Sequence, residues 1–123
     1  MNGDLWKVRF VEPDDQMLVD RTGTLTVATT DPKTLTVFLS LQLRGDFLMT
    51  VFIHELGHCA LYSFGLLPRI HKMVYPEYWV DMEELICNIL ADYGLKVFKI
   101  AYKKMGYRAW EVIPYEFERY IAS

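Results

Sequence analysis

The chain has 123 residues, of which 52% are hydrophobic and 15% aromatic, and its formal net charge is −3 at pH 7. This length suffices for one domain with a single core, and the apolar content excludes an extended disordered chain. The acidic balance argues against nucleic acid as the main partner. We therefore expect one α+β domain over residues 1–123.

The first residues, Met1 to Asp4, do not begin a basic segment followed by an apolar run, so the sequence predicts no secretory signal. No stretch approaches the roughly 18–20 apolar residues that a membrane span requires. Cys59 and Cys87 fall within predicted helices, which is typical of small buried side chains in a reducing compartment. These features predict a cytoplasmic protein without a membrane partner.

The N-terminal third is rich in strand-forming residues. Residues 5–11 alternate apolar and charged side chains, which predicts a half-buried strand. Two threonine-rich runs, residues 24–27 and 34–37, also favour strands, and residues 30–33 between them read as a turn. We expect an antiparallel hairpin and, with the first strand, a small antiparallel N-terminal sheet.

The hydrophobic period changes to three or four residues from about Leu43 and continues to Gly65. This predicts a buried helix of about 20 residues that ends at Gly65. Residues 66–80 are expected to form an aromatic loop.

A second helix is predicted from near Asp81 to Gly106, with Gly94 either bending it or separating two helices. Its apolar stripe is expected to dock on the first helix, and it contains Leu85, Ile86, Ile89, Leu90, Tyr93, Val97, Ile100 and Ala101.

The first helix carries the pentapeptide His54-Glu55-Leu56-Gly57-His58. Because residues four apart lie one turn above each other, His54 and His58 point from the same helix face. Two imidazoles so arranged can bind one zinc ion at roughly 2.0–2.1 Å each. Glu55 can reach a metal-bound water without being a ligand, which is the arrangement of the H-E-x-x-H motif of zinc peptidases.

A catalytic zinc site takes three protein ligands and keeps one position for water. Leu61 and Phe64 stand where the metzincin motif requires Gly and His, which excludes that class. Helical phase favours Glu84, because Glu84 and Asn88 lie beside the apolar stripe, whereas Glu83 is expected to point toward solvent. Glu83 stays the alternative, and the other downstream residues considered are His71, Glu77, Asp81 and Asp92.

The two motifs, His54-Glu55-x-x-His58 and Glu84-x-x-x-Asn88, resemble those of the gluzincins, the thermolysin-like zinc peptidases. The layout of the chain is similar to the small minigluzincin-like zincins of phages, prophages and bacteria, and more loosely to the ImmA/IrrE group. The resemblance implies a zincin-like fold, Zn²⁺ bound by His54, His58 and Glu84, and zinc metalloendopeptidase activity with Glu55 activating the zinc-bound water. It also implies that Asn88 orients a ligand histidine in place of the usual Asp, without adding negative charge.

A stabilising donor for the tetrahedral oxyanion is left open among His71, Tyr75, Tyr78 and Tyr93. An edge strand at residues 34–40 is expected to pair with an extended peptide or protein substrate.

The alternative function is a non-proteolytic or latent zinc-bearing regulatory module, such as a phage accessory protein. In that reading the apolar segment from Trp110 to Tyr120 lies across the site, and Glu111, Glu116 or Glu118 occupies the open zinc position. The natural substrate, the cleavage preference and the oligomeric state are left open by the sequence.

Overall fold

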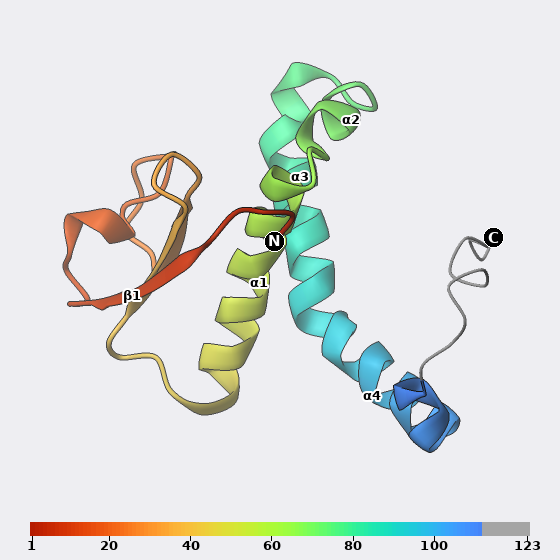
Figure 1. The fold of residues 1–123 in the computed structure, drawn as a ribbon. Helices are drawn as coiled ribbons and strands as arrows, with labels where there is room; N and C mark the ends of the chain where they lie inside the picture. The colour runs from red at the N-terminus through yellow and green to blue at the C-terminus, as the bar shows by residue number, and fades with distance from the viewer. Residues whose placement is uncertain (112–123) are drawn as a thin grey trace.

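The computed structural model describes residues 1–111 as a mixed α+β structure, in which the sheet, helix α1 and the α3–α4 rod lie side by side (Figure 1). The strands are β1 (Lys7–Val11), β2 (Ala28–Asp31) and β3 (Thr36–Ser40). The helices are α1 (Gly45–Ser63), α2 (Leu67–His71), α3 (Trp79–Ile89) and α4 (Leu95–Met105), with short 3-10 helices at Gln16–Leu18, Pro76–Tyr78 and Gly106–Trp110 and a π-helical segment at Leu90–Gly94. Within residues 1–111, no helix is both long and apolar enough to cross a membrane.

The sheet has the strand order β1-β3-β2 and is mixed, so the expectation of an antiparallel sheet is only half right. An antiparallel hairpin is present as predicted, but its first strand is β2 at Ala28–Asp31 and not residues 24–27, and it includes Thr30 and Asp31 of the predicted turn. Strand β1 pairs with β3 in parallel. The chain passes through β2 between these two strands, which gives it the crossover that parallel pairing requires. Residues 24–27 contribute an isolated bridge, Val19 to Leu25, and the turn extends to Leu35, whose φ is +51°.

The core lies on both sides of α1. One cluster joins the sheet to α1 and contains Ala28, Val37, Leu39, Leu43 and Cys59, and another joins α1 to α2 and α3 through Leu61, Ile70 and Cys87. Cys59 and Cys87 are free, buried thiols, as the sequence indicated. Helix α1 therefore packs on two sides, which explains why it has apolar residues on more than one face.

Helix α1 has 19 residues and ends at Ser63, just before Gly65, whose φ of +63° marks the predicted stop. Residues near the start of the chain form hydrogen bonds with this end of the helix. Trp6 Nε1 donates to Ser63 Oγ at 2.7 Å, Ser63 Oγ donates to Asp4 Oδ2 at 2.8 Å, and Asn2 Nδ2 donates to the Ser63 carbonyl at 2.9 Å.

Helix α3 approaches α1 most closely at Gly57. A Cβ placed on Gly57 would lie 3.0 Å from Cys87 Sγ and 3.4 Å from Cys87 Cα. The missing side chain therefore lets the two backbones come together beside the histidine pair.

The second helix begins at Trp79, two residues before the expected start, and residues 66–80 contain α2 and a 3-10 turn in addition to loop. Pro68 lies in the first turn of α2, where its missing N–H costs no hydrogen bond. The backbone stays helical through Gly94, since the π-helical segment links α3 to α4, and α4 ends at Gly106 as predicted.

The prediction that the apolar stripe docks α3 onto α1 is wrong. The face of α3 that meets α1 contains Glu83, Cys87 and Ala91, all buried, while Leu85 and Ile89 are about half exposed. The reason is local: α1 presents Gly57 and polar histidines to α3, and small or polar residues fit that surface. Of the stripe, Ile86 packs partly against the core.

Candidate metal site

Three side chains from two helices converge between α1 and α3. His54 Nε2 and His58 Nε2, one turn apart on α1, are 3.2 Å from each other. Glu84 reaches them from α3, with Oε2 3.1 Å from His54 Nε2 and Oε1 3.3 Å from His58 Nε2. The structure thus brings together the two histidines and the carboxylate favoured by the sequence.

The spacing of these donor atoms suits a small divalent ion. In a tetrahedral zinc site with bonds of roughly 2.0–2.1 Å, the ligand atoms are about 3.3–3.4 Å apart. Here the two imidazole nitrogens are 3.2 Å apart, and Glu84 contacts them through different oxygens, Oε2 at 3.1 Å from His54 and Oε1 at 3.3 Å from His58. One ligand atom from each of the three residues lies within 4.8 Å of the other two. Two imidazole nitrogens and one carboxylate oxygen also form a donor set that zinc accepts. The residues present fit the ion.

Glu83 is buried behind His58, so the expectation that it points toward solvent is wrong. Glu83 is only 8% exposed, and its Oε1 accepts a hydrogen bond from His58 Nδ1 at 2.9 Å. That bond keeps the proton on Nδ1 and leaves Nε2 of His58 free to bind a metal. The phase argument failed because the docking face of α3 is centred on Glu83 and Cys87 rather than on the apolar stripe.

Arg21 joins the two carboxylates from the other side. One guanidinium nitrogen is 3.0 Å from Glu83 Oε2 and the other is 3.4 Å from Glu84 Oε1. Arg21 belongs to a turn in which Asp20 Oδ1 accepts hydrogen bonds from the backbone N–H groups of Thr22 and Thr24. Nothing in the local sequence indicated Arg21, because its partners lie more than sixty residues away.

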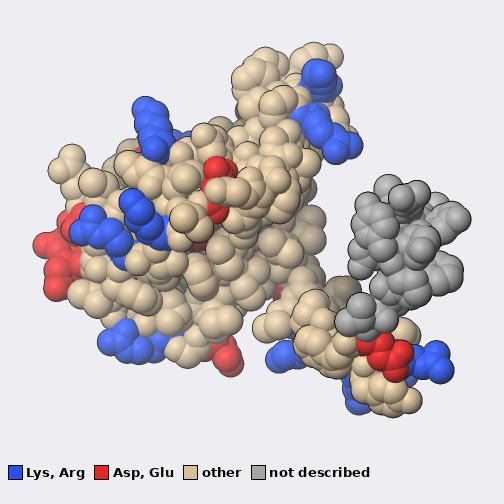
Figure 2. Space-filling model, in the orientation of Figure 1, with Lys and Arg blue, Asp and Glu red and all other residues tan. Residues whose placement is uncertain are grey.

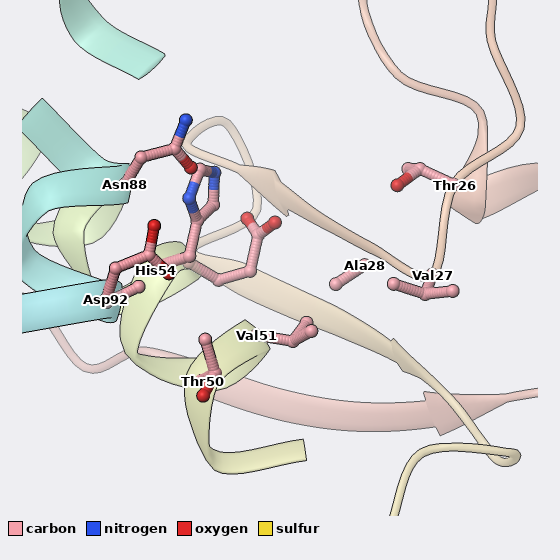
Figure 3. Close-up of a pocket in the computed structure, with 10 residues that line it drawn as sticks. Thr26, Val27, Ala28, Thr50, Val51, His54, Asn88 and Asp92 are labelled. Atoms are coloured by element: carbon pink, nitrogen blue, oxygen red, sulfur yellow. The ribbon is translucent and has the colours of Figure 1, made fainter. Parts of the chain in front are cut away.

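Asn88 lies next to His54 but does not take the role expected for it. Figure 3 shows Asn88 beside the His54 ring and Asp92 at the same pocket, which has a volume of about 230 Å³. Among residues 1–111, Asn88 makes no side-chain hydrogen bond to either histidine. The carboxylate that orients a ligand histidine is Glu83, on His58.

Glu55 is buried and lines the same cleft as the three metal-site residues, outside their group. Residue Glu55 is 6% exposed, and its Oε2 accepts a hydrogen bond from Thr30 Oγ1, on β2, at 2.6 Å. The hydroxyl of Thr30 fixes one carboxylate oxygen, so the other is available for chemistry. Sequence reasoning missed Thr30, which comes from a strand 25 residues earlier.

The charges of the site are strongly coupled. Hydrogen bonds from His54 and His58 lower the pKa of Glu84. Burial lowers the pKa of His58, but its hydrogen bonds to Cys87, Glu83 and Glu84 together raise it to about 12. Burial would raise the pKa of Glu83, yet His58 and Arg21 lower it on balance. In the metal-free chain the two carboxylates are therefore ionised and His58 carries a proton at neutral pH.

A cleft of about 710 Å³ gives access to this site. Its walls include His54, Glu55, His58 and Glu84, the turn around Arg21, and strand β2. The edge strand nearest the site is thus β2, and not residues 34–40, which contain the central strand β3.

None of the four residues considered as oxyanion donors lines either pocket. His71 stacks on Trp79 with ring centroids 4.1 Å apart, and Tyr75, Tyr78 and Tyr93 are largely exposed.

The segment expected to cover the site is described only as far as Glu111. Trp110 packs against Tyr102 of α4, with ring centroids 4.8 Å apart. The remaining residues of that prediction, Tyr115, Glu116, Phe117, Glu118 and Tyr120, lie outside the described part of the chain.

No protein-family model matches this chain, and no curated protein matches its sequence.

Proposed function

We propose that this chain is a zinc metallopeptidase that hydrolyses peptide bonds. The supporting observation is the group of His54, His58 and Glu84, in which one ligand atom from each residue lies within 4.8 Å of the other two, a spacing that one zinc ion can bridge. Glu55 lines the same cleft as this group, where a general base is needed.

In the proposed reaction, His54, His58 and Glu84 would hold the metal. A zinc ion bound there would supply a Lewis acid that makes water acidic enough to lose a proton near pH 7. Glu55 accepts the proton as the water attacks the substrate carbonyl, and then donates it to the leaving amine. The hydroxyl of Thr30 keeps the Glu55 carboxylate in place during both transfers.

The second carboxylate and the guanidinium have supporting roles. Glu83 holds the Nδ1 proton of His58, which raises the basicity of the imidazole toward a metal. Arg21 contacts Glu83 and Glu84 and offsets the repulsion between these two negative charges.

The proposed substrate is an extended segment of a peptide or protein. Strand β2 forms one wall of the cleft and, within residues 1–111, is an edge strand of the sheet, so its outer side can add an extended strand. An extended chain bound there passes Glu55, because Thr30 of β2 contacts that carboxylate.

The test compares wild-type chain with Glu55→Gln, each loaded with zinc and incubated with a peptide library that is read by mass spectrometry. Glu55→Gln should keep one zinc per chain and lose about 10²–10⁴-fold in cleavage rate, the usual contribution of a general base. Glu77→Gln is the matched control, because Glu77 is exposed on a 3-10 turn and lines neither pocket.

Two results would contradict the proposal. One is cleavage by Glu55→Gln at the wild-type rate, which would remove Glu55 from the reaction. The other is a zinc-loaded wild-type chain that cleaves nothing in the library, which would favour the non-proteolytic zinc-bearing module.

A further inference from the structure

The pocket of about 230 Å³ beside His54 is joined to the larger cleft of the metal site. The two hollows share four lining residues: Thr26, Ala28, His54 and Glu55. They therefore meet at the proposed general base, where the cleaved bond of a substrate lies. The pocket is smaller than the roughly 300–1,000 Å³ of sites that hold drug-sized ligands, so it suits a single side chain of a peptide.

The pocket has small apolar walls and a polar side. Its apolar lining residues are Val27, Ala28, Val51 and Ala91. Figure 3 shows Asn88 and Asp92 on one side of the pocket and residues 26–28 on the other. Ala91 and Asp92 belong to the π-helical segment, and such segments are frequent at functional sites. Walls of this kind suit a long side chain whose methylene groups lie against apolar residues and whose charged end reaches a polar group.

The carboxylate of Asp92 is available to a ligand. Within residues 1–111, no Lys or Arg lines the pocket and Asp92 makes no salt bridge. Lys96 follows one helical turn later, but its ammonium lies over the ring of Tyr93, 5.8 Å from the centroid. The other lysines of the rod belong to α4, and Figure 2 shows blue side chains around the projecting end of the molecule where that helix lies.

The lining of the adjoining cleft is also acidic. Besides the metal-site residues and the general base, it includes the carboxylates of Asp20, Asp31 and Asp81. Within the described residues, Arg21 is the one Lys or Arg in this lining, and it already pairs with two glutamates. The carboxylates of the metal site and of the general base offset the charge of a bound zinc ion. A cleft with this balance attracts cationic ligands.

We propose that the pocket selects substrates with a Lys or Arg side chain next to the cleaved bond, and that Asp92 binds the cationic end of that side chain. The inference rests on the proposed peptidase function and names its substrate class, basic peptides. The substrate's methylene groups lie against Val51 and Ala91. Its ammonium or guanidinium donates hydrogen bonds to the Asp92 carboxylate, and the amide oxygen of Asn88 is a second acceptor. An acidic side chain is repelled by the same carboxylate.

The first experiment digests a peptide library with the zinc-loaded full chain and reads the products by mass spectrometry. The amino ends of the peptides are acetylated, so that a side chain is the only cation available to the pocket. One position next to the cleaved bond should be enriched in Lys and Arg and depleted in Asp and Glu. A library that is cleaved only with free amino ends would place the terminal ammonium at Asp92 and would overturn the proposal.

Variants of Asp92 test the residue itself, with two peptides that differ only in Lys or Met at the selected position. In Asp92→Asn, the ratio of kcat/KM for the Lys peptide to that for the Met peptide should fall by about tenfold or more, because a hydrogen bond to a charged group is lost. Asp92→Lys should reverse the preference, so that a Glu peptide is cleaved faster than the Lys peptide.

The control is Glu77→Gln, a charge loss outside both pockets, which should keep the wild-type ratio. A structural defect slows both peptides alike and does not change this ratio. An unchanged ratio in Asp92→Asn would therefore overturn the proposal.

Peptide binding separates this inference from the proposed function. Fluorescence anisotropy of labelled peptides with the metal-free full chain gives Kd without cleavage. The Lys peptide should bind about tenfold or more tightly than the Met peptide, and Asp92→Asn should abolish the difference. A chain that shows this preference but cleaves nothing when loaded with zinc would support the pocket and contradict the peptidase. Equal Kd values together with cleavage would overturn the pocket and leave the peptidase standing.

Discussion

On helix α3 the buried face is more polar and the exposed face more apolar, which is the reverse of the usual arrangement. The inner face buries a carboxylate, Glu83, with the small residues Cys87 and Ala91, while the outer face exposes Leu85 and Ile89. Polar residues are normally outside, and they are buried when a partner satisfies them. Glu83 has two such partners, His58 and Arg21. Burial on this helix therefore follows the site that α3 completes and not the hydrophobicity of its residues.

The largest expected effect comes from removing Glu84, the carboxylate that contacts Nε2 of both histidines. Glu84→Ala should lower zinc affinity by at least ~100-fold, beyond what loss of a group behind a ligand costs. The control is Leu85→Ala, the adjacent residue on the outer face, which should leave zinc affinity unchanged. Competition with a chromophoric chelator measures both. If Glu84→Ala still bound one zinc ion tightly, Glu84 would not be a ligand, and the two variants would not differ as predicted.

A methyl group added between α1 and α3 should destabilise the fold. Gly57→Ala places a Cβ 3.0 Å from Cys87 Sγ, and overpacking of this kind costs about 1–3 kcal/mol. Urea unfolding of the metal-free chain at one fixed protein concentration gives this free energy. Adding Cys87→Ala should make the double variant less destabilised than the sum of the two single changes. Strictly additive effects would mean that the helices are not in contact at this point.

Removing only the charge of Glu83 should weaken metal binding less than removing Glu84. Glu83→Gln leaves the side chain in place but no longer stabilises the Nδ1 proton of His58, so zinc affinity should fall about 10–100-fold. Glu77→Gln, a charge loss on an exposed 3-10 turn that lines neither pocket, serves as the control and should have no such effect. Equal affinities for the two variants would remove Glu83 from the site.

The smallest expected effect is a dependence of zinc affinity on pH. In the metal-free chain the raised pKa of His58, about 12, means that zinc must displace a proton at neutral pH. Affinity should therefore rise with pH, by about tenfold per unit for one displaced proton. Calorimetry in two buffers of different ionisation enthalpy counts the protons released. Zinc binding at pH 7 without proton release would contradict this charge assignment.

Local patterns in the sequence predicted the elements that carry the histidines. The three-to-four-residue period placed α1 to within a few residues, because its apolar side chains meet core on two sides. The antiparallel pairing of β2 with β3 was predicted, but the turn sequence placed the first strand about four residues too early in the chain. Parallel pairing of β1 with β3 was not predicted, since it depends on the path of the intervening chain.

The apolar stripe of α3 exposed the limit of pattern reading. A pattern shows which residues avoid water, and it does not show which molecule covers them. Because the stripe was taken as the docking face, Glu83 was wrongly predicted to point toward solvent. Glu84 was still predicted as a ligand because it lies between the two faces of α3. Arg21 and Thr30 reach the site from loop and strand positions far away in sequence, where no local signal exists.

The fastening of the first residues to Ser63 has a consequence for synthesis. Trp6 and Asp4 find their partner 57 and 59 residues later in the chain. At roughly 5–20 residues per second, the ribosome takes about 3–12 s to add that stretch. Strand β3 is complete at Ser40, so β1 gains its strand partner before the end of α1 has been synthesised. The hydrogen bonds that join the first residues to α1 form last, once Ser63 has left the exit tunnel.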